Sequence, residues 1–442
     1  MRIILITLLF MFFNLSVKAN QGKKNNLFEF IGKDSFYNDE NQSFYKYKFK
    51  NGLKLVVLEG ETDEVILNIL VNAGNSRELE KVYAIPLNPY LSEKIFLNSK
   101  SSSKLNDFYV ANDELFQTFN YIKFSYEFDP EKFDFVISNA FQAIKNPDLS
   151  NSGIEKAKND VRNYMDLKFN NSFFLSFFKC LKDKKLIERD PNEEILRVNN
   201  KKVKEYYSKF FTSNNIIIIV ESKLKPEFIA NKLSKFVDVL PNGSPVPYVD
   251  VKKLVLAGLN LVNQDISCEV KDKKISKMNL DIKLFPNFNY TAKDIIYRSV
   301  LSKAISNNYS IYAKNDKHKI IMIENMDFPS NNYFLDSFSI MNLKDNNENF
   351  NEIVKQSVSN VLNAEQKIDE EYYLFDNDKK LDYLYYNVML GENNIYDQGK
   401  INQLAKDFDI KDFENWVNKK YLNNEYVISV SLNTNLNVET LK

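Results

Sequence analysis

Two periodicities of hydrophobic and polar residues run along the chain, and in the first 130 residues the period of two dominates. Residues 44–60, FYKYKFKNGLKLVVLEG, show two alternating runs around Asn51-Gly52, a pair that favours a tight turn between antiparallel strands. Residues 64–74 are apolar almost throughout and predict a buried strand. Residues 107–128 return to alternation and predict two further strands. We therefore expect an antiparallel or mixed sheet here.

Helical spacing of apolar residues begins at residues 90–97 and becomes regular after residue 130. Residues 130–147 predict a helix with Pro130 in its first turn, where proline is tolerated. Residues 152–169 predict another, with Ser152 as its N-cap. Further elements of the first half are a buried strand at 214–220 and a helix at 225–240.

The second half of the chain repeats this order of strands followed by helices. Residues 241–250, PNGSPVPYVD, hold three prolines and predict a linker. The elements predicted beyond it are strands at 268–286, 309–314, 319–326, 333–342 and 424–432, and helices at 291–306 and 348–363. We expect two tandem homologous α+β domains, residues 44–240 and 251–442, each with an antiparallel or mixed sheet packed against helices.

The N-terminus carries the clearest targeting signal. Arg2 precedes a short uncharged run, and the small residue Ala19 follows, which predicts a signal peptide over residues 1–19. A retained membrane anchor is the alternative, although the run is short for a bilayer. Residues 20–43 are polar and predict a loose N-terminal arm. No later segment is apolar for long enough to span, so we expect an exported protein, located in the periplasm.

Composition narrows the classes of function further. Lys+Arg and Asp+Glu both number 59, so the net charge gives no indication of a nucleic-acid partner. The chain lacks a Gly-x-Ser-x-Gly elbow, a P-loop and a Gly-rich dinucleotide turn. Its single histidine, His318, lies in a polar turn and is more typical of a solvated residue than of a metal ligand. Cys180 and Cys268 could form one disulfide or remain two buried thiols.

Three segments carry a resemblance to a known family. NGLKLVVLEG followed by VILNILVNAGNSRE, the close of the first half from NNIIIIV to VLPNGSPVP, and LSKAISNNYSIYA in the second half resemble the M16 family of pitrilysin, insulinase and mitochondrial processing peptidase. The resemblance covers nearly all of residues 44–442. It implies two homologous domains that enclose a chamber, in which an extended peptide adds to the edge of the first sheet.

The family's zinc site falls on unsuitable residues in this chain. Family members bind zinc through His-x-x-Glu-His on a helix and a downstream Glu; the resemblance places these at Tyr90, Glu93, Lys94 and Tyr164 (or its neighbour Asn163). A protonated phenol and a cationic ammonium cannot replace neutral imidazoles as zinc ligands. We therefore expect no metal and no cofactor. Glu93 would be a relic position or an ordinary surface residue, and Lys94 would pair with it or with another nearby carboxylate.

The family's substrate-clamping Arg and Tyr are also only partly present. The resemblance places the Tyr at Tyr309, a tentative substrate-binding residue, and the Arg at Ser302, with Lys303 beside it. Tyr309 could donate a hydrogen bond to a peptide carbonyl. The alternative is a strand tyrosine whose ring lies in the core.

These observations predict a catalytically inactive, exported M16 homologue. We expect it to be the non-catalytic subunit of an active M16 zinc protease, with extended peptides as further partners. The alternative is a stand-alone periplasmic peptide-binding or scaffold protein. A working metalloendopeptidase with divergent ligands is the third hypothesis.

Overall fold

The structure is a computed structural model. It describes residues 27–36, 39–74, 77, 87–110, 120–169, 182, 183, 185, 189, 191–246, 266–270, 276–288, 291–315, 319–328, 333–342, 350–363, 380, 381, 384–390, 403–423 and 428–436. The predicted signal peptide, Cys180 and His318 lie outside these residues.

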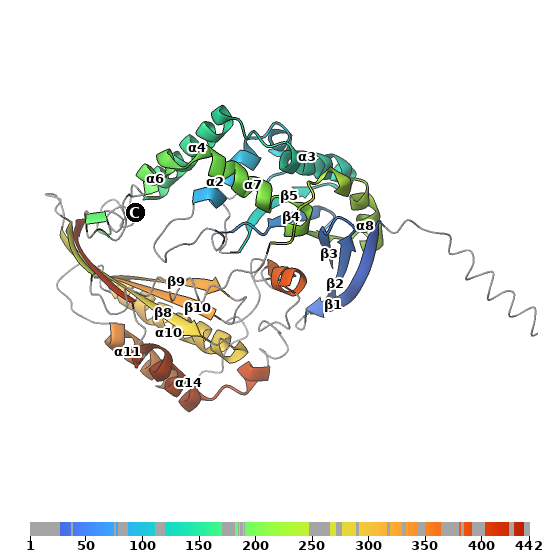
Figure 1. The fold of residues 1–442 in the computed structure, drawn as a ribbon. Coiled ribbons are helices and arrows are strands. Elements are labelled where there is room, and N and C mark those ends of the chain that lie inside the picture. Colours follow the sequence, from blue (N-terminus) through green and yellow to red (C-terminus); the bar gives the residue numbers. More distant parts are fainter. Residues whose placement is uncertain are drawn as a thin grey trace, which may run out of the picture.

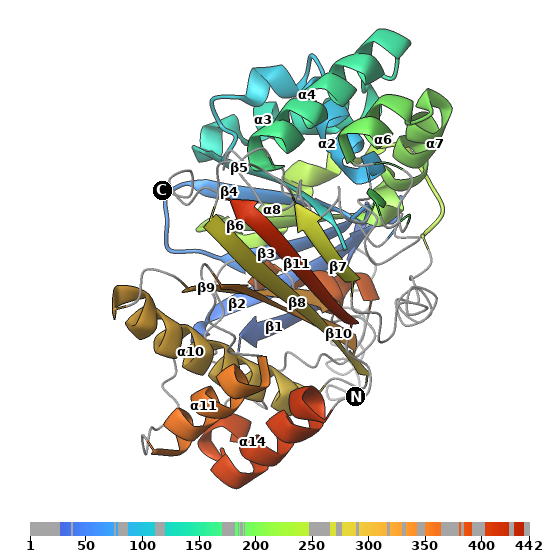
Figure 2. The same cartoon turned by 90° about the vertical axis from the view of Figure 1, so that its left-hand side faces the viewer.

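The first half of the chain forms a six-stranded mixed sheet (Figures 1 and 2). Its order is β1-β2-β3-β6-β4-β5, and every neighbouring pair is antiparallel except β3 and β6. Gly52 has φ +86° in the turn between β2 and β3, which confirms the predicted hairpin. The strands are β1 (Phe28–Phe36), β2 (Asp39–Phe49), β3 (Lys54–Glu59), β4 (Val65–Val71), β5 (Ile122–Phe128) and β6 (Ile216–Ser222).

Within the described residues of the first half, six helices cover one face of this sheet. Alternate strand residues such as Leu55, Leu67 and Ile218 point into a single core with them, as the period of two requires. The helices are α2 (Leu87–Leu97), α3 (Phe133–Lys145), α4 (Asn151–Phe169), α6 (Pro191–Arg197), α7 (Asn200–Phe210) and α8 (Pro226–Ser234). The other face of the sheet, which we call the second face, presents Phe44, Val56, Leu58, Leu70, Ile217 and Ile219.

The second half builds a five-stranded sheet with its own helices. The order is β7-β11-β8-β10-β9, and only β7 and β11 are parallel. Both sheets lie between the two sets of helices in Figures 1 and 2. The elements are β7 (Ile266–Val270), β8 (Ser276–Phe288), α10 (Ala292–Asn315), β9 (Lys319–Phe328), β10 (Tyr333–Asn342), α11 (Phe350–Asn363), α14 (Ile410–Val417) and β11 (Ile428–Leu436).

The two sheets share a pattern of strand neighbours. In the first sheet, β3 and β6 are parallel, whereas β6 and β4, and β4 and β5, are antiparallel. In the second sheet, β7 and β11 are parallel, whereas β11 and β8, and β8 and β10, are antiparallel. Tyr109 forms an isolated antiparallel β-bridge with Tyr126 of β5. Its position beside β5 in the first sheet therefore corresponds to that of β9 beside β10 in the second sheet. Mixed sheets packed with helices confirm the α+β prediction.

Three local expectations differ from the structure. Residues 309–314 belong to α10 and not to a strand, because Leu301, Ile305, Tyr309 and Tyr312 continue a helical spacing. Residues 28–36 and 39–43 form strands in place of a loose arm, since Phe28 and Phe30 pack on Tyr47.

The third concerns the start of α4. α4 begins at Asn151, and the Oγ of Ser150, not Ser152, accepts a hydrogen bond from Gly153 N at 3.0 Å. Residues 241–246 of the predicted linker pack on the turn before β6: Pro241 O accepts from Ser213 N at 2.9 Å, and Val246 N donates to Asn215 Oδ1 at 3.0 Å.

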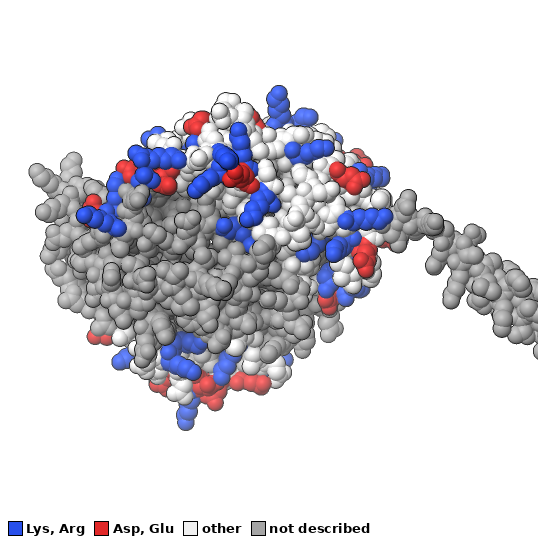
Figure 3. Space-filling view, in the orientation of Figure 1, with Lys and Arg blue, Asp and Glu red and all other residues white. Residues whose placement is uncertain are grey.

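Charges of both signs are interspersed on the described surface of the face shown in Figure 3. This fits the equal numbers of acidic and basic residues in the sequence. Among the described residues, none of the helices has the length and apolar character needed to span a membrane.

Candidate functional site

The candidate site lies on α2, a helix that is buried on most of its sides. Leu87, Leu91 and Ile95 recur every fourth residue and are at most 4% exposed. The ring of Phe96 lies 3.8 Å, centroid to centroid, from that of Phe124 in β5. Packing from both sides therefore fixes the direction in which Tyr90, Glu93 and Lys94 leave the helix.

Tyr90 faces α4, the helix that carries the predicted downstream position. The rings of Tyr90 and Tyr164 have centroids 6.5 Å apart and planes inclined by 38°. A hydrogen bond of 2.8 Å from Asn98 Nδ2 to Asp160 Oδ2 holds the same two helices together farther along. Asn163, the other residue considered, is exposed. Tyr164 is therefore the residue that α4 places beside α2.

Glu93 is completely buried, contrary to the expectation of an ordinary surface residue. Burial raises the pKa of Tyr109, and the negative charge of Glu93 raises it further, so the carboxylate lies close enough to this phenol to act on it. The ring of Tyr109 in turn lies beside that of Tyr126, with centroids 5.6 Å apart and planes inclined by 58°.

Lys94 points in a different direction and is only half-buried. Adjacent residues on a helix lie about 100° apart around its axis, so Glu93 and Lys94 do not share a face. Within the described part of the chain, no ion pair joins them. The expected pairing of Lys94 with Glu93 is therefore wrong.

This donor set does not fit zinc. Two phenols and an ammonium offer no neutral nitrogen or thiolate, and one carboxylate alone does not make a site. Within the residues that the structure describes, no group of three or more His, Cys, Asp or Glu side chains is placed to hold a metal. What α2 does present is a buried carboxylate, Glu93, near Tyr109, and a tyrosine ring, Tyr90, that lies beside Tyr164 of α4.

The second predicted element, around Tyr309, lies on α10. Ser302 and Tyr309 are seven residues apart, which is close to two helical turns, so both positions share one side of the helix. The side chain of Tyr309 lies outside the described part of the structure, and its role stays a prediction.

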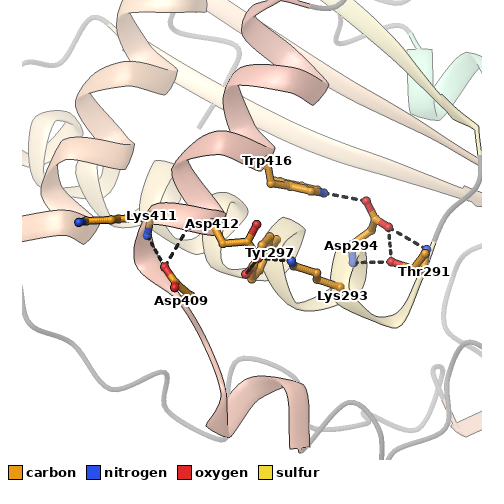
Figure 4. Close-up of polar contacts among 8 residues, drawn as sticks. All are labelled: Thr291, Lys293, Asp294, Tyr297, Asp409, Lys411, Asp412 and Trp416. Carbon is orange, nitrogen blue, oxygen red and sulfur yellow. Dashed lines mark hydrogen bonds and ion pairs between the residues drawn. The ribbon is translucent and has the colours of Figure 1, made fainter.

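Sequence reasoning did not identify the polar cluster that begins α10 (Figure 4). Thr291 and Asp294 bond each other at the first turn, a capping arrangement in which Asp294 Oδ2 accepts from Thr291 N at 2.8 Å. Trp416 of α14 donates its Nε1–H to Asp294 Oδ1 at 2.7 Å. On the next turn Tyr297 donates to Asp412 Oδ2 at 2.9 Å. The cluster ties α10 to α14. The spacing Thr-x-x-Asp at the start of the helix predicted at residues 291–306 could have indicated this capping arrangement.

No family model matches this sequence, and no curated protein matches it. Solved structures do match its fold. A protease from Helicobacter pylori superposes with TM-score 0.63 at 14% identity, over 88% of this chain and 99% of that one. The structure described as the inactive domain of peptidase M16 from Pseudomonas fluorescens gives TM-score 0.62 at 10% identity, over 89% and 98%.

The fold is that of M16 peptidases. The periplasmic protease PqqL from Escherichia coli matches with TM-score 0.55 at 11% identity, over 91% of this chain and 48% of PqqL. The chain thus spans about half the length of PqqL. At these identities the likeness establishes the fold alone.

Proposed function

We propose that this chain is an exported, catalytically inactive M16 homologue that serves as the non-catalytic subunit of an active M16 zinc protease. The observation that carries the proposal is the contact between Tyr90 and Tyr164. The two helices on which M16 enzymes hold zinc are packed together here, with aromatic rings at the positions that should supply metal ligands.

The proposed architecture is two tandem homologous domains, residues 44–240 and 251–442. Matching strand relations in the two sheets support this duplication. The match over 99% and 98% of two solved chains, one of them described as an inactive domain, supports a half-molecule that works with a second half.

Export rests on the pattern of residues 1–19 and on the match to PqqL, which is described as periplasmic. Mass spectrometry of the mature protein tests it. An N-terminus at Asn20 is expected; a retained Met1 would contradict cleavage of the signal peptide and favour the retained membrane anchor.

The partner role is tested by affinity purification from an envelope extract of the source cells after mild cross-linking. We expect a second M16 chain with an intact His-x-x-Glu-His sequence. Purification of the protein alone, as a monomer, would contradict the subunit role and favour a stand-alone peptide-binding or scaffold protein.

The absence of catalysis is tested by metal analysis and by restoring the family ligands. The combined variant Tyr90→His, Lys94→His and Tyr164→Glu places two imidazoles one turn apart on α2, opposite a carboxylate on α4. We expect about one zinc per chain in this variant and none in the natural protein. Tyr90→His alone, with one ligand, is the matched control. Stoichiometric zinc in the natural protein, with peptide cleavage abolished by a chelator, would overturn the proposal.

A further inference from the structure

A short segment of the second half is docked on the first sheet. We call residues 380, 381 and 384–390 the latch segment; residues 386–390 form a π-helical turn. In Figure 1 it is the short orange helix between the two sheets. Leu381, Leu384 and Tyr385 are 7%, 0% and 2% exposed, and they pack on the second face of the first sheet. An apolar patch that belongs to the first half is thus covered by residues from the second.

Polar contacts fix the position of the latch segment on this patch. Tyr385 donates its hydroxyl to Asn72 Oδ1 at 2.7 Å, and its ring centroid lies 4.9 Å from that of Tyr121. At the other end, Lys46 Nζ donates to Asn387 Oδ1 at 3.3 Å. Apolar burial supplies attraction without direction, whereas these bonds select one register of the segment on the sheet.

Asn72 connects the latch segment to the turn that precedes α2. Its Oδ1 accepts a second hydrogen bond from the Nη2 of Arg77. Arg77 N also donates to Gly74 O at 3.0 Å. Tyr206 of α7 donates to Ala73 O at 2.8 Å, and α7 packs against α2. The Oδ1 of Asn72 therefore accepts one hydrogen bond from the second half of the chain, through Tyr385, and one from Arg77, which precedes α2 in the sequence.

We propose that the latch segment fastens the second half of the chain to the first sheet and, through the hydrogen bonds that Tyr385 and Arg77 donate to Asn72, orders residues 72–74 and 77, which Tyr206 of α7 connects to α2. Release of the latch exposes the second face and removes one of the two donors to Asn72. The order of residues 72–74 and 77, and through α7 the position of α2, then depend on whether the latch segment is docked. This inference does not rest on the proposed subunit role.

The test is hydrogen–deuterium exchange of the full chain with Tyr385→Phe, which removes one hydroxyl and keeps the ring. A buried hydrogen bond of this kind changes an opening equilibrium by roughly 2- to 10-fold. We expect backbone exchange to accelerate by about that factor both in residues 384–390 and in residues 72–77. The matched control is Tyr297→Phe, which removes the hydroxyl of an equally buried tyrosine that bonds Asp412. It should accelerate exchange only in α10 and α14.

Leu384→Ala provides a second perturbation of the same contact without touching the hydrogen bonds. It removes a fully buried side chain from the patch, and exchange should accelerate in the same two segments. The inference is overturned if either variant leaves residues 72–77 unchanged while residues 384–390 accelerate, because the two segments would then be uncoupled. It is equally overturned if residues 384–390 exchange at the natural rate in both variants.

Discussion

Lys54 provides the sharpest quantitative test of the contact between the two halves. It stands on β3, on the second face, and its Nζ donates to Met389 O at 3.3 Å and contacts Met389 Sδ at 3.1 Å. Both partners are neutral. Burial, and after it the positive charge of Lys48, the cross-strand neighbour of Lys54, together lower the pKa of Lys54 from 10.5 to about 8.

The sign of the pH dependence follows from proton binding. Because the pKa is lower in the folded protein, the folded state binds fewer protons than the unfolded chain between pH 8 and 10.5. The free energy of unfolding therefore rises with pH through this window, and below pH 8 the whole cost of burying the ammonium is present. A pKa lowered to about 8 corresponds to roughly 3 kcal/mol; since water still reaches part of the side chain, we expect about 1–2 kcal/mol.

The perturbation is Lys54→Met, which keeps an unbranched side chain and removes the charge. Urea unfolding followed by circular dichroism should show the variant about 1–2 kcal/mol more stable than the natural protein near pH 7. The difference should shrink by about half or more near pH 9.5, because the natural lysine is then largely neutral.

The control for this experiment is Lys50→Met, which makes the same change at an exposed turn position and should alter stability by less than about 0.5 kcal/mol at both pH values. A Lys54→Met variant that is less stable than the natural protein near pH 7 would refute the reasoning. A stability difference that is independent of pH would refute it as well.

Three further predictions concern stability. Gly74→Ala places a Cβ 2.4 Å from main-chain atoms of the facing segment, so we expect a loss of more than about 3 kcal/mol in the free energy of unfolding, measured by urea titration; a loss below about 1 kcal/mol would contradict this close approach. Asp294→Asn removes a buried charge and should lower the free energy of unfolding of the second half by about 1–3 kcal/mol, measured through the fluorescence of the only tryptophan, Trp416. An unchanged unfolding transition would count against the hydrogen bond between Trp416 and Asp294. Ser150→Ala should lower the melting temperature through loss of about 1 kcal/mol, while Ser152→Ala should have little effect; the reverse order would restore the N-cap predicted from the sequence.

Much of the fold could be predicted because its signals are local. The Asn51-Gly52 turn and the alternation around it specify the hairpin, and Gly52 has the positive φ that this turn requires. Helical spacing located α2, α3 and α4 to within a few residues. The error at residues 309–314 has the same origin: Tyr and Ile favour strands, but α10 continues because its apolar residues keep a helical spacing across them.

The candidate site was predicted only in part. The resemblance placed Tyr90 and Tyr164 at corresponding positions, and the structure brings their rings to 6.5 Å. The burial of Glu93 was not predicted, since a helix with apolar residues on several sides gives no clear polar face. No pattern in the sequence indicated that the latch segment packs on the first sheet.

What the sequence determined alone is most of the strands and helices, and the chemical identity of the side chains at the positions where a zinc site would be. Both depend on a residue and its near neighbours. Tertiary structure decided that Glu93 is buried, that residues 28–36 extend a sheet, and that Tyr385 reaches Asn72 across 313 residues. Such contacts depend on which surfaces pack together after the sheets have formed. The periodicity of a single segment shows which of its faces is apolar, but not which other segment packs against that face.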